Sequence, residues 1–193
     1  MRLSRNFFQQ KTLKVAKELL GCFLIRQIGR RRIVARIIET EAYCGPNDLA
    51  NHASKGLTPR TKIMFGPAAH AYVYLIYGMY YCFNVVTEKK GYPAAVLIRG
   101  VEIRDAKIIG PGKVCREMKI DKCLNGIDLL KSDKLQIVRL AERFNPPPVK
   151  RIKKFPRVGV DYAGEYKDKK WRFVLINPVR DLSNGINKKG KVL

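Results

Sequence analysis

Apolar and β-branched residues fall mainly in short runs that are separated by turn-forming residues. These runs predict six strands, over residues 22–28, 32–43, 71–76, 79–87, 94–99 and 171–176. Two helices are expected, one over residues 12–20 with Thr12 as its cap and one over residues 113–119 after Gly112. Strands in hairpin-like succession, with the helices set apart, predict an α+β (mixed α/β) fold with a mainly antiparallel sheet.

The length of 193 residues favours one domain, which we expect to span residues 1–193. A Pro-rich break at residues 145–148 is a candidate boundary, and a basic run follows it at residues 150–154. About 45 residues lie beyond the break, which is too few for an independent hydrophobic core of any size.

The chain carries 39 Lys and Arg residues against 16 Asp and Glu, a formal net charge of +23. A surface this cationic attracts polyanions, among which nucleic acid is the commonest partner and an acidic membrane the next. A proteome-wide bias toward Lys is the plain alternative, although it does not account for the many Arg residues. A hydrophobic content of 46% argues against a disordered chain.

The five cysteines form no CxxC pair and show no zinc-ligand spacing, so we expect no metal site. Their odd number and the lack of an apolar signal segment favour the cytoplasm. Residues 63–87 carry no formal charge, but Gly66, Pro67 and Asn84 interrupt this stretch and no sustained aliphatic run is present. We therefore expect no membrane span.

Glu39, Glu41 and Tyr43 alternate along a predicted strand and therefore share one of its faces. Their spacing places the two carboxylates about 7 Å apart. One carboxylate could activate water while the aromatic ring holds a planar ligand. The alternative is a solvated edge strand whose acids face Lys or Arg, and the spacing by itself leaves both interpretations open.

Tyrosines are concentrated in residues 72–81, where Tyr77 falls at the turn between two predicted strands. An aromatic side chain at an exposed hairpin tip can act as a wedge between base pairs or as a platform on which unpaired bases stack. The alternative is a core hairpin in which Tyr72 and Tyr74 bury their rings and hydrate their hydroxyl groups.

Two further features give only weak evidence of function when residue spacing alone is considered. His52 lies in a loop of turn-forming residues and His70 precedes a predicted strand, and an isolated histidine in such a place is most often an ordinary packed or surface residue. Residues 110–113, Gly-Pro-Gly-Lys, lack the Walker A pattern and are better explained as the entry to a helix.

Short motifs follow one another in a fixed order along the chain. They are IETEAYCGP at 38–46, NHA at 51–53, TPR at 58–60, YVYLIYGMY at 72–80, CFN at 82–84, VLIR at 96–99, GPGK at 110–113 and RVGV at 157–160. In this order and spacing the chain resembles the alkyladenine (3-methyladenine) DNA glycosylases from Phe7 to near Val174.

The resemblance implies a single domain with a curved, mainly antiparallel sheet, a protruding β-hairpin and peripheral helices. It implies a monofunctional enzyme that starts base-excision repair on double-stranded DNA and needs no cofactor. The expected substrates are alkylated and deaminated purines, namely 3-methyladenine, 7-methylguanine, hypoxanthine and ethenoadenine. The expected state is a monomer, with no membrane partner.

The resemblance also assigns roles inside the pocket, position by position. Glu41 matches the general base, and Arg99 matches the residue that holds the attacking water, together with a backbone carbonyl near Val160. The residues that match the walls around the flipped base are Tyr43, His52, Tyr74 and Asn84, the last of which crowds the 2-amino group of guanine.

Outside the pocket, Tyr77 matches the hairpin side chain that fills the gap left in the duplex. Arg60 and Lys62 fall in a family segment near the DNA backbone. Asp161 and Tyr162 depart from the Gly-His pair that a relative has at this place, so that wall of the pocket and the range of substrates are expected to differ.

Two other classes of function remain as alternatives, a noncatalytic nucleic-acid-binding module and a basic ribosome-associated protein. The feature that discriminates between them and an enzyme is Glu41 with Arg99. A binding module has no use for a lone carboxylate in a basic cleft, because the carboxylate repels phosphate.

Overall fold

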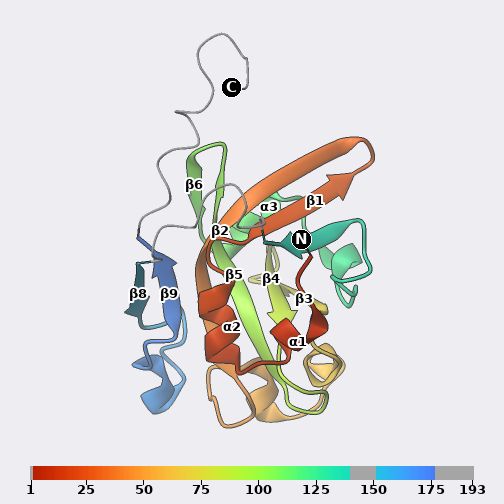
Figure 1. Ribbon diagram of the computed structural model, residues 1–193. Coiled ribbons are helices and arrows are strands. Elements are labelled where there is room, and N and C mark those ends of the chain that lie inside the picture. The colour runs from red at the N-terminus through yellow and green to blue at the C-terminus, as the bar shows by residue number, and fades with distance from the viewer. Residues whose placement is uncertain (1, 140–150, 177–193) are drawn as a thin grey trace.

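The 14-residue strand β2 (Arg31–Cys44) is the centre of the fold. Its first half pairs with β1 (Phe23–Ile28) and its second half with β5 (Ala94–Ile103). On its other side, residues 39–41 also pair with β9 (Arg172–Leu175). The computed structural model describes residues 2–139 and 151–176 (Figure 1).

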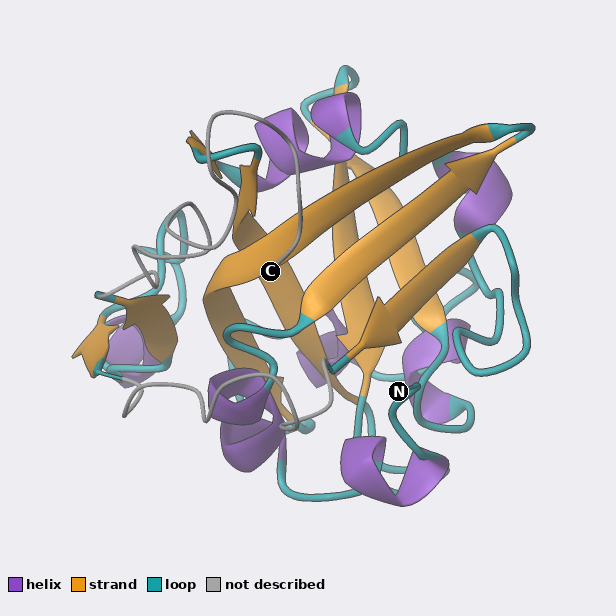
Figure 2. Cartoon of the chain, turned by 45° about the horizontal axis from the view of Figure 1, so that its top comes forward, coloured by secondary structure: helices purple, strands orange, loops and turns teal. Residues whose placement is uncertain are grey.

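The strands form one curled antiparallel sheet, in the order β3-β4-β5-β2-β1-β7. Figure 2 shows the curl of this sheet with the top of the molecule turned forward. The other strands of the sheet are β3 (Ala71–Ile76), β4 (Tyr80–Val86), β6 (Ala106–Ile109), β7 (Leu135–Val138) and β8 (Ile152–Phe155). β6 extends the sheet beside β5, and β8 pairs with β9. The predicted α+β fold with a curved, mainly antiparallel sheet is confirmed.

Within the described residues, three short α-helices lie at the periphery, α1 (Arg5–Phe8), α2 (Thr12–Glu18) and α3 (Pro111–Glu117). The prediction of Thr12 as a cap was wrong, because the cap position is Lys11 and the Thr12 hydroxyl donates instead to Glu88, 2.6 Å away. The segment 110–113 is a helix entry, as predicted. Gly110 takes a φ of 108° there and Pro111 occupies the first helical turn, where a missing N–H costs nothing.

The predicted strands all exist, with ends that differ by a few residues, and β3 has the predicted bounds. The short strands β6, β7 and β8 were not predicted, and the basic run at 150–154 largely becomes β8. The Pro-rich break at 145–148 lies outside the described residues. The described residues on either side of it belong to the same sheet, because β9 pairs with β2.

The two faces of the sheet differ in what they cover. One face packs Val73, Phe83, Val96 and Ile98 into the main hydrophobic core. Val15 and Leu19 of the α2 region and Val114 of α3 complete that core. Alternate residues of the same strands therefore point to the opposite face. None of the described helices has both the length and the hydropathy that a bilayer span needs.

Candidate active site

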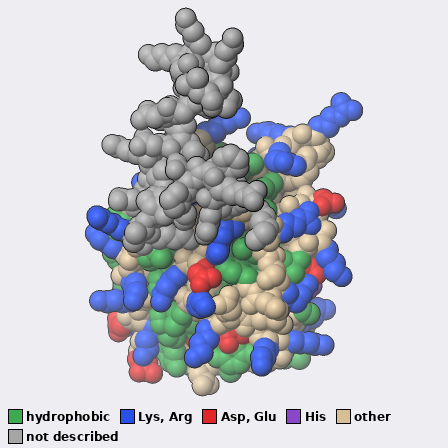
Figure 3. All heavy atoms as spheres, in the orientation of Figure 1, with side chains coloured by type: hydrophobic (Ala, Val, Ile, Leu, Met, Phe, Trp, Pro, Cys, Tyr) green, Lys and Arg blue, Asp and Glu red, His purple; other side chains and the backbone are tan. Residues whose placement is uncertain are grey.

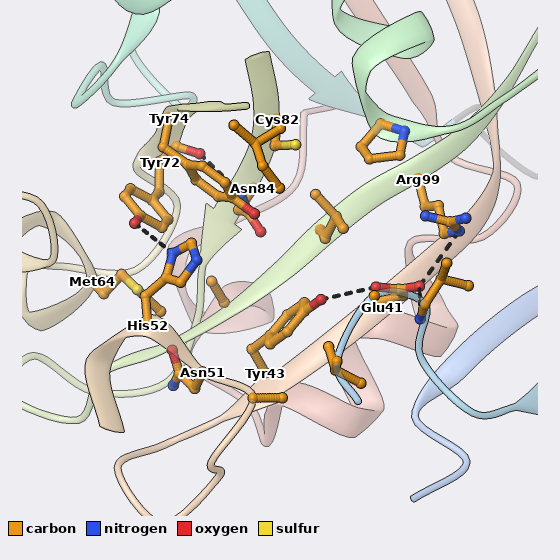
Figure 4. A pocket seen from close by; sticks show the side chains of 18 of the residues that line it. Glu41, Tyr43, Asn51, His52, Met64, Tyr72, Tyr74, Cys82, Asn84 and Arg99 are labelled. Atoms are coloured by element: carbon orange, nitrogen blue, oxygen red, sulfur yellow. Dashed lines mark hydrogen bonds and ion pairs between the residues drawn. The ribbon is translucent and has the colours of Figure 1, made fainter. Parts of the chain in front are cut away.

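A pocket opens on the face of the sheet that lies opposite the main core (Figure 4). The strand register aligns the residues that form the floor of the pocket. Glu41 lies opposite Leu97, Leu97 opposite Asn84, and Asn84 opposite Tyr72. Directly paired residues point to the same face, so these four side chains form a row across β2, β5, β4 and β3. The loops add further walls, which include His52, Val158, Val160 and Tyr162.

The Glu41 carboxylate is fully buried at one end of this pocket. Its Oε2 accepts a hydrogen bond from the Tyr43 hydroxyl at 2.9 Å, and its Oε1 accepts one from the Val158 backbone N–H at 3.2 Å. The Arg99 Nε lies 3.4 Å from the same Oε1. Burial raises the pKa of Glu41 above its ordinary value, against the lowering effects of Arg99 and of the two hydrogen bonds.

The interpretation of Glu39 and Glu41 as acids on a solvated edge strand was wrong. β2 is flanked by β5 and β9 at these positions, and the exposed fractions are 3% for Glu39 and 0% for Glu41. The acids do face arginines, but they do so inside the protein. The Oε1 of Glu39 accepts hydrogen bonds from Arg99 and from Arg172, each at 3.0 Å.

The opposite end of the pocket is aromatic. The His52 ring lies edge-on to Tyr74 with centroids 4.6 Å apart, and its Nδ1 lies 3.0 Å from the Tyr72 hydroxyl. Burial, with the nearby cations Arg60 and Lys55, lowers the pKa of His52 to about 4. The imidazole is therefore neutral at physiological pH and does not repel a cationic ligand.

The alternative of a core hairpin is correct for the base of the β3–β4 hairpin only. Tyr72 is buried and Tyr74 is half-buried against the pocket, whereas Tyr77 at the tip is 80% exposed. Tyr77 has a φ of 52° and Gly78 a φ of 68°. A bulky residue in the left-handed region is strained, and such strain is concentrated at functional positions.

The buried ion pair of Arg157 and Asp48, which packs against the Tyr43 ring, could not be predicted from the sequence. The Arg157 guanidinium lies 4.8 Å from the Tyr43 ring centroid and 5.0 Å from that of Trp171. Asp48 binds it through two hydrogen bonds, of 2.6 and 2.8 Å, with both side chains fully buried. Arg157 belongs to the RVGV motif, but its partner is 109 residues away along the chain, so no local pattern reveals the pair.

The remaining predicted pocket residues are also in the wall. The Asn84 side-chain amide donates to the Tyr72 carbonyl at 3.2 Å, and Val160 is buried with its carbonyl accepting from the Ala163 N–H at 2.9 Å. Tyr162, one of the two departures from the family pattern, lines the pocket while 69% of it is exposed. The other, Asp161, is exposed.

The residues predicted near DNA lie outside the pocket. The Arg60 guanidinium is 4.9 Å from the Tyr74 ring centroid, and Lys62 is exposed on a neighbouring 3-10 turn, Lys62–Phe65. Figure 3 shows Lys and Arg side chains over much of the visible face, with few acids among them. This surface suits a polyanion.

The described ranges contain no group of three or more His, Cys, Asp or Glu side chains that could hold a metal ion. All five cysteines lie within these ranges, and none of them forms a disulfide. His70 does not line this pocket, and its Nδ1 lies 2.9 Å from the Pro67 carbonyl.

An aromatic slot that ends at a buried carboxylate suits an enzyme acting on a planar ring. The family model described as methylpurine-DNA glycosylase matches residues 6–178. A protein of Methanocella arvoryzae is 50% identical over 187 residues, covering 89% of this chain and 90% of its own length. One of Legionella pneumophila (strain Lens) is 51% identical over 178 residues, covering 90% and 94%. Both are named "Putative 3-methyladenine DNA glycosylase".

The chain belongs to the methylpurine-DNA glycosylase family, as the sequence motifs predicted. It is therefore a DNA glycosylase, an enzyme whose substrate is DNA. The two nonenzymatic alternatives, a binding module and a ribosome-associated protein, are thereby set aside.

Proposed function

We propose that this protein removes alkylated or deaminated purines from double-stranded DNA by hydrolysing the N-glycosidic bond with a water molecule that Glu41 activates. The observation that carries the proposal is the buried Glu41 carboxylate at the end of the aromatic pocket, with Arg99 beside it. The expected substrates are 3-methyladenine, 7-methylguanine, hypoxanthine and ethenoadenine. The enzyme acts as a cytoplasmic monomer whose catalytic domain spans residues 1–193.

The chemical step uses only water and side chains. Glu41 takes a proton from water, and the water oxygen forms a bond to C1′ of the sugar. The bond from C1′ to the purine nitrogen breaks, and its electron pair leaves with the base. Positive charge develops on the sugar, which the Glu41 carboxylate stabilises. Arg99 orients the water, and the Val160 carbonyl is a further acceptor for it.

The target base has to leave the duplex before this step, at a cost of a few kcal/mol. Tyr43, His52 and Tyr74 offer aromatic faces and edges on which a flipped purine stacks. A cationic base such as 7-methylguanine gains a cation–π attraction there, and the neutral His52 does not oppose it. Asn84, held against the Tyr72 carbonyl, would crowd the 2-amino group of guanine.

The primary test is a base-release assay on duplexes that each contain one hypoxanthine or one ethenoadenine. We expect release of the free base and an abasic site, without strand cleavage and without an adduct that borohydride can trap. Duplexes with an unmodified purine at the same position are the control. If neither lesion is released, the proposal is wrong.

At the hairpin tip, Tyr77→Ser tests whether Tyr77 fills the space that the flipped base vacates. We expect single-turnover excision of hypoxanthine from a fully paired duplex to fall about tenfold, because the base returns to the stack more readily. Excision from a duplex in which the lesion is mismatched should fall less, since less pairing is regained.

A matched control for Tyr77→Ser is Met79→Ser, which changes another exposed apolar residue of the same tip, 66% exposed. It should leave both rates nearly unchanged. Equal losses on paired and mismatched duplexes with Tyr77→Ser would contradict the wedge role.

A further inference from the structure

A second buried carboxylate lies beside Glu41 without lining the pocket. Glu39 is 3% exposed, and its Oε1 accepts from the Arg99 Nε and from an Arg172 terminal nitrogen, both at 3.0 Å. The same Arg99 Nε is 3.4 Å from the Glu41 Oε1. One guanidinium edge is thus shared by two carboxylates and lies closer to Glu39.

This arrangement is built into the backbone. The ladder between β2 and β5 shifts register around Glu39, where Ile37 opposes Val101, Glu39 opposes Gly100 and Thr40 opposes Ile98. Arg99 is therefore left without a directly opposing residue. A β-bulge of this kind redirects a side chain, and bulges are frequent beside active sites.

Gly100 makes room for the buried carboxylate. A Cβ atom at this position would lie 2.8 Å from the Glu39 Cβ and 3.2 Å from its Oε2. β9 then closes the other side of Glu39, where it brings Arg172 next to the carboxylate. The bulge, the glycine and the strand pairing together accommodate one buried carboxylate that does not line the pocket.

Burying a carboxylate costs desolvation free energy, so the presence of Glu39 next to Glu41 calls for an explanation. Were Glu39 neutral, the Arg99 charge would act on Glu41 alone. The ion pair would then tighten, and a carboxylate held in a tight ion pair is a weaker base. Glu39 thus binds the Nε edge of Arg99, a residue that also lines the pocket.

We propose that Glu39 is a positioning residue, which holds Arg99 by its Nε edge so that Arg99 faces the water and Glu41 remains a competent base. This inference rests on the proposed function of Glu41. Arg172, which lies directly opposite Glu41 in the ladder between β2 and β9, has the complementary role, since its guanidinium balances the charge of Glu39.

The pH dependence of the reaction separates this role from a merely structural one. The charged and titratable groups around the Glu41 carboxylate are Glu39 and Tyr43 of β2, Cys82 of β4, Arg99 of β5, Arg172 of β9, which opposes Glu41 in the ladder and pairs with Glu39, and Arg157 behind Tyr43. Among them Glu39 raises the pKa of Glu41, whereas Arg99 lowers it.

The experiment compares Glu39→Gln with Arg172→Gln on an ethenoadenine duplex. With Glu39→Gln, the single-turnover rate at neutral pH should fall by up to about 100-fold, because the water is misplaced. The acid limb of the kcat/KM profile should move to lower pH by about one unit, since a negative neighbour is lost and Arg99 turns wholly to Glu41. With Arg172→Gln the acid limb should move to higher pH, because the loss of a nearby cation raises the pKa of Glu41.

The matched control is Glu102→Gln, which removes a carboxylate from another cross-strand ion pair of β2 and β5, Glu102 with Arg36 at 3.6 Å. It should change neither the rate nor the acid limb. An unmoved acid limb in Glu39→Gln, with parental activity present, overturns the inference and leaves the proposed function intact. Should Glu39→Gln fail to fold, an unmoved limb in Arg172→Gln has the same meaning. An inactive parent protein refutes the proposed function instead.

Discussion

Replacing Glu41 by Gln is expected to lower single-turnover base release by at least about 1000-fold while binding to lesion-containing duplex is retained. A general base contributes about 10²–10⁴-fold, and the negative charge opposite the developing sugar cation adds to this. Glutamine has nearly the same shape as glutamate but cannot take the proton from water. Release is measured from hypoxanthine duplex, and binding by fluorescence anisotropy on ethenoadenine duplex.

The glutamine side chain of the Glu41→Gln variant can keep both local contacts. Its carbonyl oxygen can accept from the Val158 N–H, and its amide can donate to the Tyr43 hydroxyl, which lie on opposite sides of the present carboxylate. Loss of activity therefore does not require loss of the pocket. Turnover equal to that of the parent enzyme would refute the role of Glu41 as base.

Stability measurements give an independent control for this variant. Burial raises the pKa of Glu41, so the folded protein holds this proton more tightly than the unfolded chain does. The corresponding stability is fully present below the unfolded-state pKa and is lost as the pH rises through the folded-state pKa. Glutamine never ionises, so the free energy of unfolding of Glu41→Gln at neutral pH should equal or exceed that of the parent.

The largest expected loss of stability comes from Asp48→Asn. Asp48 holds the buried Arg157 guanidinium with two hydrogen bonds, and its oxygens also accept from the Cys44 and Ala50 N–H groups at 2.9 and 3.1 Å. Without the charge of Asp48, the cation is buried without a counter-ion, which costs about 3–5 kcal/mol. That is a large part of the stability of an ordinary domain, about 5–15 kcal/mol.

Urea unfolding measures this loss, and Asp133→Asn is the matched control. Asp133 also pairs with an arginine, Arg2 at 3.0 Å, but its side chain is 89% exposed. A surface pair of this kind contributes about 0–1 kcal/mol, so the control should unfold nearly as the parent does. A loss below about 1 kcal/mol with Asp48→Asn would show that the pair does not stabilise the fold.

The strands that are bounded by clear turn-forming residues could be predicted from the sequence. β3 was predicted with its bounds because four of its six residues are aromatic or β-branched and a turn at Tyr77-Gly78 follows. β6, β7 and β8 were not, since each has four residues and exists through its neighbour in the sheet. β8 carries two lysines and was interpreted as a basic run, because no local signal shows that β9 pairs with it.

Some features of the site could likewise be predicted from the sequence, and others could not. Alternation predicted that Glu39, Glu41 and Tyr43 share a face, and the family motifs predicted the set that the pocket brings together. The burial of both acids could not be predicted, since it depends on β9 pairing with β2 from more than 130 residues away. The Val158 N–H on Glu41, at a separation of 117 residues, is equally invisible in a local pattern.

The order in which the pocket is assembled has a consequence for synthesis. Glu41 is made early, but the amide that binds it, the arginine behind Tyr43 and the strand that closes over Glu39 all come from residues 157–175. A nascent chain that ends before these residues carries the reactive acid in an open, hydrated strand. Residues up to about 175 must therefore leave the ribosome before the surroundings of Glu41 can be completed.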